Sequence, residues 1–501
     1  MSELVFGIDF GTTYSTVAVC EGGGAARVVE GAGGDRVTPS VVYYAQDGSR
    51  VVGEHAISRG VLEPDRTITG IKRLIGRAFD TRVVQDFAKT IPYAIEPDDQ
   101  RYCVVRVGDR RHPPGEIATA IFSELRDRAK AATGASVITA VITAPAHFGA
   151  AERRGIHAAA TRAEIDVLRV LTEPTAASVA YGARAKAGER VLIFDLGGGT
   201  LDVTVLRIDE DVHEILAVGG HPLLGGLDFD NALCEELESQ ILVQTGLNVR
   251  DQPVAHRRLL LTTEQIKREL SDVAHVDRTL PQLLEGKDVR LTYTRAALEM
   301  RISRLVDRAI EIAQNVLRDS GIHKQELDRL LLVGGSTRVP LVRRRLEEEF
   351  GKILSHAVHP QEAVALGAAQ FAATLGTSRA MRLLDVLPAS VGIADSQGRM
   401  ISLIKRNSTL PCEGSFEIEF GGQESRQLVV FQGEQEFVDD NEAIGMVNLL
   451  VDNDPVERAL VTVRADGEGM VTVSAFDAAK GRVLRTQFSL RVAQRLSAWA
   501  R

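Results

Sequence analysis

Two short segments share a pattern of glycine, threonine and aspartate that is suited to binding phosphate. Residues 6–13 read FGIDFGTT and residues 193–200 read IFDLGGGT. In each segment a hydrophobic run ends in an aspartate, and a glycine-rich turn follows. Glycines allow backbone N–H groups to approach phosphate oxygens, and threonine hydroxyls add further donors. The aspartates, Asp9 and Asp195, are suited to holding a hydrated Mg²⁺ ion that offsets phosphate charge.

Either segment alone has a second interpretation, an ordinary hairpin turn that contains glycine. Two copies with aspartate and threonine at matching positions instead favour a pair of hairpins that grip a triphosphate from opposite sides. The sequence contains no GxxxxGK(S/T) motif, which argues against a P-loop enzyme. The pattern predicts phosphate contacts from Gly11, Thr12, Thr13, Gly197, Gly198 and Gly199.

A third segment pairs a hydrophobic run with two glycines. Residues 330–333 (LLLV) lead into Gly334, Gly335 and Ser336, and Arg338 follows. The glycines permit the close backbone approach that a ribose or an adenine edge requires, and the arginine side chain can stack on a base. Alone, this segment is more typical of a turn beside a surface arginine, and the two other glycine-rich segments strengthen the nucleotide interpretation.

The elements that must position these residues alternate between strand and helix up to residue 377. Short hydrophobic runs at 5–9, 137–143, 191–195 and 330–333 predict strands. Residues 298–317 place their hydrophobic side chains on one helical stripe. Such alternation is typical of α/β layering.

The pattern changes after Gly376. Residues 389–490 show short alternating runs without a long helical stripe, and Asp466-Gly467 predicts a hairpin turn. We expect an all-β sandwich there, joined to the α/β domain (1–377) by a linker over 378–388. Residues 491–501 are expected to form a short helix or a tail.

Composition narrows the classes of function. The net charge of −9 and pI near 5.8 give no basic face, so we expect no nucleic-acid partner. No hydrophobic run is long enough to span a bilayer, and the N-terminus lacks a signal-peptide pattern. The four cysteines form no CxxC pair, which favours buried thiols over disulfides or a zinc site. These features predict a cytoplasmic protein.

Taken with further motifs, the three glycine-rich segments resemble the DnaK-type, seventy-kilodalton heat-shock chaperones. The resemblance covers nearly all of the chain. The additional motifs are residues 34–40 (GDRVTPS), 71–77 (IKRLIGR), 142–148 (ITAPAHF), 173–177 (EPTAA), 225–230 (GGLDFD) and 332–340 (LVGGSTRVP). The resemblance implies an actin-like, two-lobed ATPase domain followed by the β-sandwich, with ATP or ADP and Mg²⁺ as ligands and K⁺ as a further cation.

The resemblance also implies roles for individual residues. Lys72 matches the catalytic lysine beside the γ-phosphate, and Glu173 matches a glutamate near the metal and the attacking water. Thr200 and Asp202 match residues around the γ-phosphate, the water and a monovalent cation. Without the family motifs, Lys72 and Glu173 would be interpreted as ordinary charged side chains. Further nucleotide contacts are implied for Gly225, Gly226, Glu264, Lys267, Arg268, Gly334, Gly335, Ser336 and Arg338.

Departures from the family pattern concern the linker and the client site. Arg382 lies within a linker that is otherwise aliphatic in the family, which predicts a desolvation cost and weaker coupling between domains. Ser396 and Arg426 stand where the family's peptide pocket is apolar. The chain ends where the family's helical lid begins, so fast client exchange is expected. Leu227, Gln361 and Thr172 replace residues usual near the nucleotide.

Three functions follow from these features. The first is an ATP-driven chaperone that binds unfolded or extended peptides in a lidless β-domain, with a J-domain co-chaperone and a nucleotide-exchange factor as partners. The second is a nucleotide-switched adaptor that docks one dedicated protein client, which Ser396 and Arg426 favour. The third is a sugar or acetate kinase, which has no use for a separate β-domain.

Overall fold

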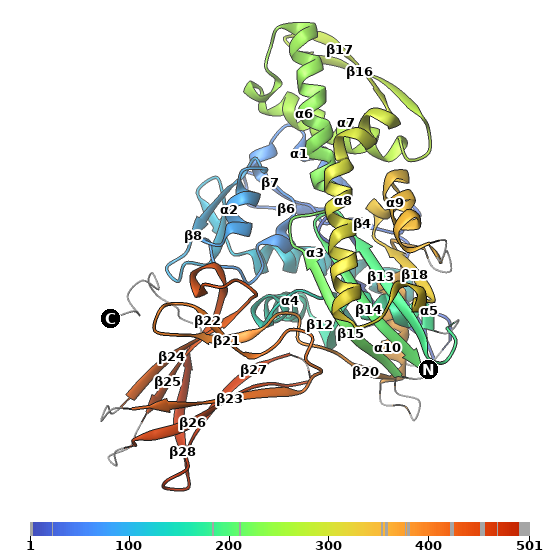
Figure 1. Cartoon of the computed structure of the whole chain (residues 1–501). Coiled ribbons are helices and arrows are strands. Elements are labelled where there is room, and N and C mark those ends of the chain that lie inside the picture. The colour runs from blue at the N-terminus through green and yellow to red at the C-terminus, as the bar shows by residue number, and fades with distance from the viewer. Residues whose placement is uncertain are drawn as a thin grey trace.

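The computed structural model describes most of the chain. The described residues are 4–22, 24–182, 185–209, 212–351, 354–355, 359–375, 377, 381–420, 425–450, 456–467 and 469–489. Figure 1 shows an α/β region up to residue 375 and a largely β region after residue 388. The expected order of an α/β region followed by a β-domain is therefore confirmed.

Two of the sheets in the described α/β region are built on the same plan. The first has the strand order β12 (Ile165–Thr172), β11 (Ile138–Ala144), β1 (Leu4–Asp9), β2 (Tyr14–Glu21) and β3 (Arg27–Val28), and β4 (Thr38–Pro39) also pairs with β2. The second has the order β19 (Leu354–Ser355), β18 (Arg329–Val333), β13 (Glu189–Leu196), β14 (Leu201–Asp209), β15 (Val212–His221) and β20 (Arg382–Leu384).

The strands that carry Asp9 and Asp195, β1 and β13, have equivalent neighbours in the two sheets. β1 pairs antiparallel with β2 and parallel with β11, and β13 pairs antiparallel with β14 and parallel with β18. The two glycine-rich turns are therefore the tips of equivalent hairpins. This duplication is the two-lobed, actin-like plan expected from the family resemblance.

Helices cover both faces of each sheet because the central strands are hydrophobic on both sides. α5 (Glu173–Gly182) and α10 (Ala363–Thr374) share a core with strands of both sheets, through Ala176, Val191 and Ala368 among others. The other face of the first sheet packs on α3 (Pro114–Thr133) and α4 (Ala150–Arg162). The second sheet packs on α6 (Gly226–Thr245), α7 (Pro253–Glu269), α8 (Arg295–Asp319) and α9 (Pro340–Phe350).

The stripe predicted over residues 298–317 lies within α8, and its Leu298, Ile302 and Val306 are buried while Leu305 is half-buried.

Smaller elements complete the region: β5 (Val42–Tyr44), β6 (Arg50–Val52), α1 (Glu54–Gly60), β7 (Thr67–Ile68), the 3-10 turn η2 (Ile71–Arg73), α2 (Arg82–Ala88), β8 (Ala94–Pro97), β9 (Cys103–Val107), β10 (Arg110–His112), η3 (Val249–Asp251), β16 (His275–Leu284), β17 (Lys287–Thr294) and η5 (Gly335–Arg338).

The β-domain is a sandwich whose two sheets share one strand. The strand order is β22 (Met400–Ile404), β21 (Val391–Ala394), β24 (Ser425–Gln432), β25 (Glu442–Leu450), β28 (Arg482–Ser489), β27 (Val471–Asp477), β26 (Arg458–Ala465) and β23 (Cys412–Glu419). β28 pairs with β25 through one half and with β27 through the other. Asp466 lies in the loop between β26 and β27, as the hairpin prediction required. Residues 491–501, predicted to be a helix or tail, lie outside the described residues.

The linker is not a free connector. Its residues Arg382–Leu384 form β20, which pairs in parallel with β15 at the edge of the second sheet. The Arg382 side chain is exposed, whereas Leu383 packs against the α/β core. The predicted desolvation cost of Arg382 is therefore wrong, because alternation along a strand turns this side chain to solvent. Val386 then enters the α/β core and Leu387 the β-domain core, so consecutive residues anchor both parts.

The β-domain packs against the α/β region along a surface that we call the seam. Arg406 of the β-domain forms an ion pair with Asp319 at the end of α8, at 2.7 Å. The backbone N–H of Val218 donates to Asn407 Oδ1 at 3.1 Å. Elsewhere along the seam, Arg154 contacts Met470, Gln432 lies beside Gly149, and Glu442 faces Glu152 and Arg77.

None of the helices within the described ranges combines the length and the hydrophobic composition that crossing a membrane requires.

Candidate functional site

A cavity of about 310 Å³ is lined by the two hairpins that carry Asp9 and Asp195. Most of the residues singled out in the sequence line it: Asp9, Gly11, Thr12, Thr13, Lys72, Glu173, Asp195, Gly197, Gly198, Thr200, Gly226, Glu264, Lys267, Arg268, Gly334, Gly335, Ser336 and Arg338. The fold thus gathers side chains from segments more than 300 residues apart. Among the sequence candidates, the residues outside this lining are Gly199, Asp202 and Gly225.

The two hairpin tips lie against each other. A Cβ atom on Gly198 would sit 2.0 Å from Thr13 Oγ1, so only glycine permits this contact. A second pair of hydroxyls supports the first hairpin from behind, because Ser40 Oγ donates to the Gly11 carbonyl at 2.8 Å and lies 2.9 Å from Ser15 Oγ. The backbone of both turns is thereby held at the cavity wall.

The third glycine-rich segment attaches to the second hairpin. Ser336 Oγ and the Gly226 N–H both donate to the Gly197 carbonyl, at 2.8 and 2.9 Å. Gly334 has a φ of +82°, and a Cβ there would lie 2.3 Å from the Leu196 carbonyl. The start of α6 and the turn after β18 are therefore fixed around the same hairpin, which places three N–H-rich turns at one end of the cavity.

Lys72 and Glu173 contact each other directly inside the protein. The Lys72 Nζ donates to Glu173 Oε1, and both side chains are buried. Lys72 comes from η2 and Glu173 is the first residue of α5. The neighbouring Arg73 donates from its guanidinium to the Gly199 carbonyl at 2.5 Å, which ties η2 to the second hairpin. An ammonium group thus stands at the carboxylate-rich floor of the cavity.

The carboxyl groups around Lys72 carry more negative charge than the protein neutralises. Burial, with repulsion from Asp9 and Asp202, raises the pKa of Glu173 to about 7. Burial and the neighbouring carboxylates raise the pKa of Asp195 well above its ordinary value, and burial raises that of Asp9. Such a set of oxygen ligands fits a hard divalent cation such as Mg²⁺, which would relieve this repulsion.

Asp202 lies behind the cavity wall and interacts with His147. The two are joined between His147 Nδ1 and Asp202 Oδ1 at 2.9 Å. Burial opposes ionisation of Asp202, but the interactions with His147 and the charge of Lys72 favour it, and together they lower the pKa of Asp202. Its other oxygen, Oδ2, is buried without a hydrogen-bond partner in the described part of the chain. A charged carboxylate with an unused oxygen is therefore available beside the hairpins.

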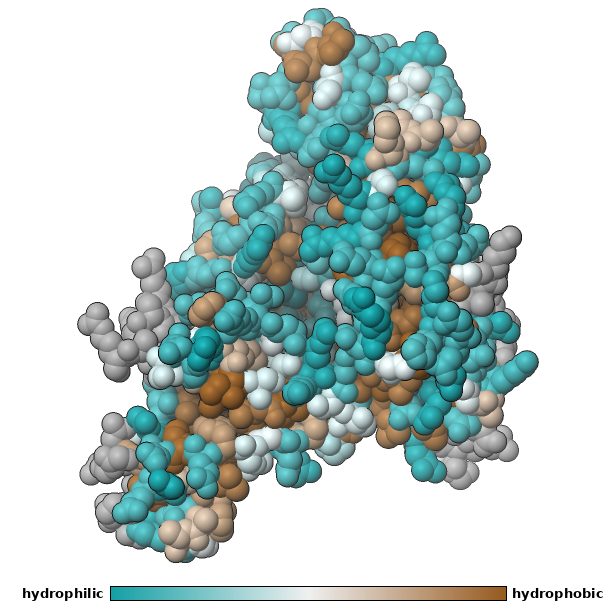
Figure 2. All heavy atoms as spheres, viewed as in Figure 1, coloured by the Kyte–Doolittle hydropathy of each residue, from teal (hydrophilic) through white to brown (hydrophobic). Residues whose placement is uncertain are grey.

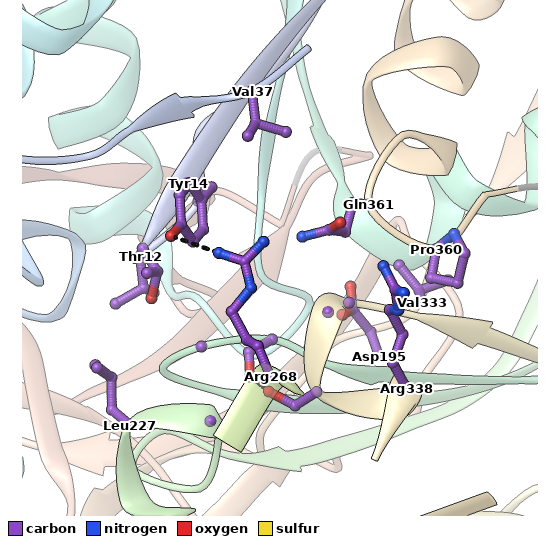
Figure 3. A pocket seen from close by; sticks show the side chains of 18 of the residues that line it. Thr12, Tyr14, Val37, Asp195, Leu227, Arg268, Val333, Arg338, Pro360 and Gln361 are labelled. Atoms are coloured by element: carbon purple, nitrogen blue, oxygen red, sulfur yellow. Dashed lines mark hydrogen bonds between the residues drawn. The ribbon is translucent and has the colours of Figure 1, made fainter. Parts of the chain in front are cut away.

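The open end of the cavity carries longer polar side chains. Tyr14 donates its hydroxyl to Glu264 Oε1 at 3.0 Å and accepts from Arg268 at 3.3 Å, a contact drawn in Figure 3. Arg338 lies across the cavity from Arg268 (Figure 3). Lys267 is held by Asp230 at 2.8 Å, and burial raises the pKa of Asp230 to about 6.

Two of the residues that differ from the family pattern also line this cavity. Leu227 and Gln361 line it (Figure 3), so their substitutions bear on the ligand itself. Thr172 is buried instead, and its hydroxyl lies 2.5 Å from that of Thr175 in the first turn of α5. Thr172 thus helps to orient the start of the helix that carries Glu173.

Tyr14, Arg73 and His147 also belong to this site, although no sequence pattern assigned a role to them. Tyr14 follows Thr13, and Arg73 and His147 lie within the motifs at 71–77 and 142–148, so position along the chain was the available signal. Their importance depends on contacts with residues far away in sequence: Glu264 for Tyr14, Gly199 for Arg73 and Asp202 for His147.

Comparison with known families identifies the family to which this chain belongs. A family model described as Hsp70 protein matches residues 5–496, which includes both the α/β region and the β-domain. Hsp70 proteins bind and hydrolyse ATP, act as chaperones, and work with peptide clients and co-chaperones. Since the match spans nearly the entire sequence, the chain belongs to the Hsp70 family.

Proposed function

We propose that the cleft hydrolyses ATP with Mg²⁺ held near Asp9 and Asp195, and that the nucleotide state controls client binding by the β-domain. Bound Mg²⁺ would neutralise phosphate charge at the hairpins. The observation that carries the proposal is the buried Lys72–Glu173 pair, set among carboxyl groups whose pKa values are raised. Mg²⁺ bound together with a triphosphate would supply the positive charge that these carboxyl groups lack.

In this proposal, four residues near the terminal phosphate have separate roles. Lys72 orients the terminal phosphate and the attacking water, because a compact ammonium group stabilises charge that develops on phosphate oxygens. Glu173 holds Lys72 and is close to the water. Thr200 offers a hydroxyl beside the γ-phosphate. Asp202, through its unused oxygen, is suited to a monovalent cation such as K⁺.

At the other end of the cavity, we assign the adenosine moiety to Glu264, Lys267, Arg268 and Arg338. The two arginines lie on opposite sides of the space in Figure 3, which suits stacking on both faces of a purine. Before a nucleotide can enter between them, Arg268 must release its hydrogen bond to Tyr14. Gly335 and Ser336 provide the close backbone surface for the sugar.

The β-domain supports the client half of the proposal. In Figure 2, hydrophobic residues gather on the β-domain more densely than on the α/β face. The exposed side chains there include Ile401, Phe437, Leu460, Phe476 and Val483. Exposed hydrophobic surface of this kind suits extended peptide segments. Docking of β20 on the second sheet offers a physical route by which lobe movement would reach the β-domain.

Isothermal titration with Mg-ATP and Mg-ADP tests the nucleotide half. We expect binding heat for both, and weaker binding when EDTA removes the metal. Absence of binding heat with either nucleotide would contradict the proposal. Replacing K⁺ by Na⁺ in a hydrolysis assay then tests the cation assigned to Asp202, with a slower rate expected in Na⁺.

A second candidate function is an adaptor that docks one dedicated partner. It is favoured by Ser396 and Arg426, which are exposed in the β-domain where an apolar pocket is expected. Fluorescent hydrophobic peptides separate the two candidates. Peptide binding that weakens when ATP is added supports the chaperone, whereas no binding of any library peptide supports the adaptor. Stimulation of hydrolysis by a J-domain protein would further support the chaperone.

A further inference from the structure

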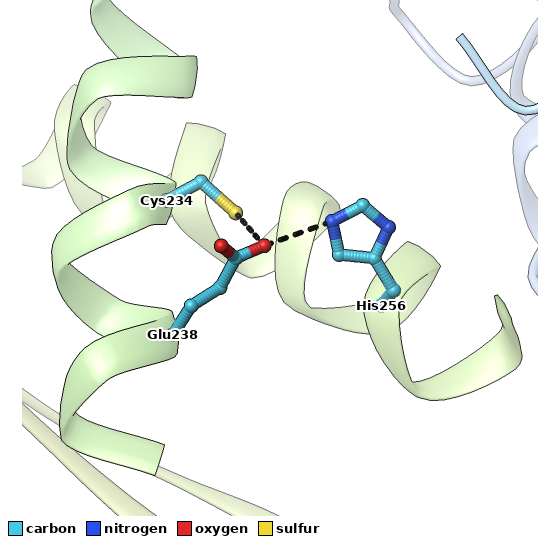
Figure 4. A group of neighbouring side chains, drawn as sticks. All are labelled: Cys234, Glu238 and His256. Carbon is cyan, nitrogen blue, oxygen red and sulfur yellow. Dashed lines mark hydrogen bonds and ion pairs between the residues drawn. The ribbon is translucent and has the colours of Figure 1, made fainter. Parts of the chain in front are cut away.

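Three side chains of the types that bind transition metals meet in the second lobe, outside the nucleotide cavity. Cys234 and Glu238 are four residues apart on α6, so they share one face of the helix, and His256 reaches them from α7 (Figure 4). One ligand atom from each residue lies within 4.8 Å of the other two. The sequence held no CxxC pair to reveal this cluster, because its ligands come from two helices that only the fold brings together.

The separations of the ligand atoms suit one small ion. Cys234 Sγ is 3.8 Å from Glu238 Oε1, and His256 Nε2 is 3.1 Å from the same oxygen. A tetrahedral ion with bonds of about 2.0–2.3 Å separates its ligand atoms by roughly 3.3–3.8 Å. Only small side-chain movements are therefore needed to place an ion between the three.

A neighbouring residue holds the carboxylate in position. Arg250, in η3, places its Nε 2.9 Å from both oxygens of Glu238. An ion that takes Oε1 leaves Oε2 to Arg250, which then acts as the outer partner that metal-binding carboxylates commonly have. The positive charge of Arg250 opposes a dication, so this arrangement favours moderate rather than very tight binding.

We propose that Cys234, Glu238 and His256 form a mononuclear Zn²⁺ site that joins α6 to α7. Sulfur, imidazole nitrogen and carboxylate oxygen together are typical of zinc, and water would complete the tetrahedron. Binding converts the thiol to a thiolate and releases its proton to solvent. Cys234 is buried and the His256 side chain is 31% exposed, so the ion enters from the histidine side.

The site has a structural consequence that is independent of the proposed hydrolysis. α7 also carries Glu264, Lys267 and Arg268, which line the nucleotide cavity. A metal bridge to α6 would restrain this helix against its neighbour. We therefore expect Zn²⁺ to raise the thermal stability of the protein, by mass action on the folded state, whether or not nucleotide is present.

Titration of the reduced full chain with Co²⁺, in excess Mg²⁺ and without nucleotide, tests the proposal. We expect one equivalent of Co²⁺ to produce thiolate-to-cobalt absorption, and added Zn²⁺ to displace it. Cobalt bound only by oxygen ligands gives no such absorption, which separates this site from the nucleotide cleft.

Two variants and one control decide the assignment. Cys234→Ser should abolish the absorption, and His256→Gln, a change at a half-buried side chain, should weaken cobalt binding about 10-fold or more. Cys412→Ser, in the β-domain, should bind cobalt as the unmodified chain does. Absence of the absorption in the unmodified chain, or its persistence in Cys234→Ser, would overturn the proposal. Circular dichroism and Mg-ATP binding report whether each variant is folded.

Discussion

The nucleotide cleft and the seam both bury more carboxylate than the protein neutralises, but they differ in how that charge can be relieved. In the cleft, Asp9, Glu173 and Asp195 surround Lys72 beside a cavity of about 310 Å³. At the seam, Glu442 faces Glu152, whose nearest cation is Arg77 at 3.4 Å. The cleft has room for a ligand cation, whereas the seam is a contact between two domains.

We infer that this surplus of charge has a different consequence in each place. In the cleft, repulsion between carboxylates would favour binding of a metal with its phosphate. At the seam, repulsion would make the contact between the two domains sensitive to protonation. The experiments that follow test these two consequences, beginning with the strongest effect.

Removing the ammonium group from the cleft should have the largest effect. In Lys72→Ala, we expect single-turnover hydrolysis of ATP to slow by roughly 10²–10³-fold, because a positioned charge on the phosphate is lost. Lys89→Ala is the matched control, since Lys89 is an exposed lysine on the same lobe paired with Asp86. A hydrolysis rate equal to that of the unmodified chain would remove Lys72 from its assigned role.

Neutralising a carboxylate in the cleft should raise the thermal stability of the nucleotide-free protein and lower its affinity for Mg-ATP. In Asp195→Asn, the nucleotide-free protein should melt at a higher temperature, because burial and neighbouring carboxylates disfavour the Asp195 charge. Affinity for Mg-ATP should fall about 10-fold or more as a metal ligand is lost. Thermal melts with and without Mg-ATP measure both effects. Asp209→Asn, at the exposed end of β14, should change neither. A lower melting temperature without nucleotide would contradict the charge-surplus interpretation.

The seam should respond to pH. Burial and repulsion from Glu152 raise the pKa of Glu442 to about 8, while Arg77 acts in the opposite direction. The docked form therefore holds a proton that the separated form releases near the ordinary value, so docking is strongest at low pH and weakens as pH rises through about 8. Small-angle scattering at pH 6 and pH 9 should show a more extended molecule at pH 9.

Glu442→Gln should abolish this pH dependence and keep the molecule compact at pH 9. The control is Glu417→Gln, a change of an exposed carboxylate on β23 that should leave the scattering profiles unaltered. If Glu442→Gln extends at pH 9 as much as the unmodified chain, the seam carboxylates do not set the docking equilibrium.

The smallest effect is expected at the ion pair between Arg406 and Asp319. Both side chains are partly exposed, so solvent and salt screen the pair. Arg406→Ala should weaken docking by about 0.2–1 kcal/mol, and the difference should shrink at high salt. Arg399→Ala, which breaks an ion pair within the β-domain, is the control. A double-mutant cycle with Asp319→Ala isolates the interaction, and a coupling energy of zero would show that this pair does not hold the seam.

Much of the fold could be predicted because its signals are local. The two hairpins follow from hydrophobic runs that end in aspartate and glycine, and α8 follows from a stripe repeated over several turns. The change to short alternating runs after Gly376 marked the β-domain. These patterns depend on neighbours within a few residues, so the sequence displays them directly. The family resemblance supplied Lys72 and Glu173, which no local pattern distinguishes from surface charges.

Local patterns in the sequence are enough to predict the hairpins, the order of the domains and the kinds of residues available to the cleft. Tertiary structure decided which of them meet: Lys72 with Glu173, Asp202 with His147, and Cys234 with His256 across two helices. The fold also leaves the Arg382 side chain exposed to solvent, whereas the sequence predicted that it would be buried. The physical reason is that burial and charge balance depend on every element packed around a side chain, and those elements come from distant parts of the chain.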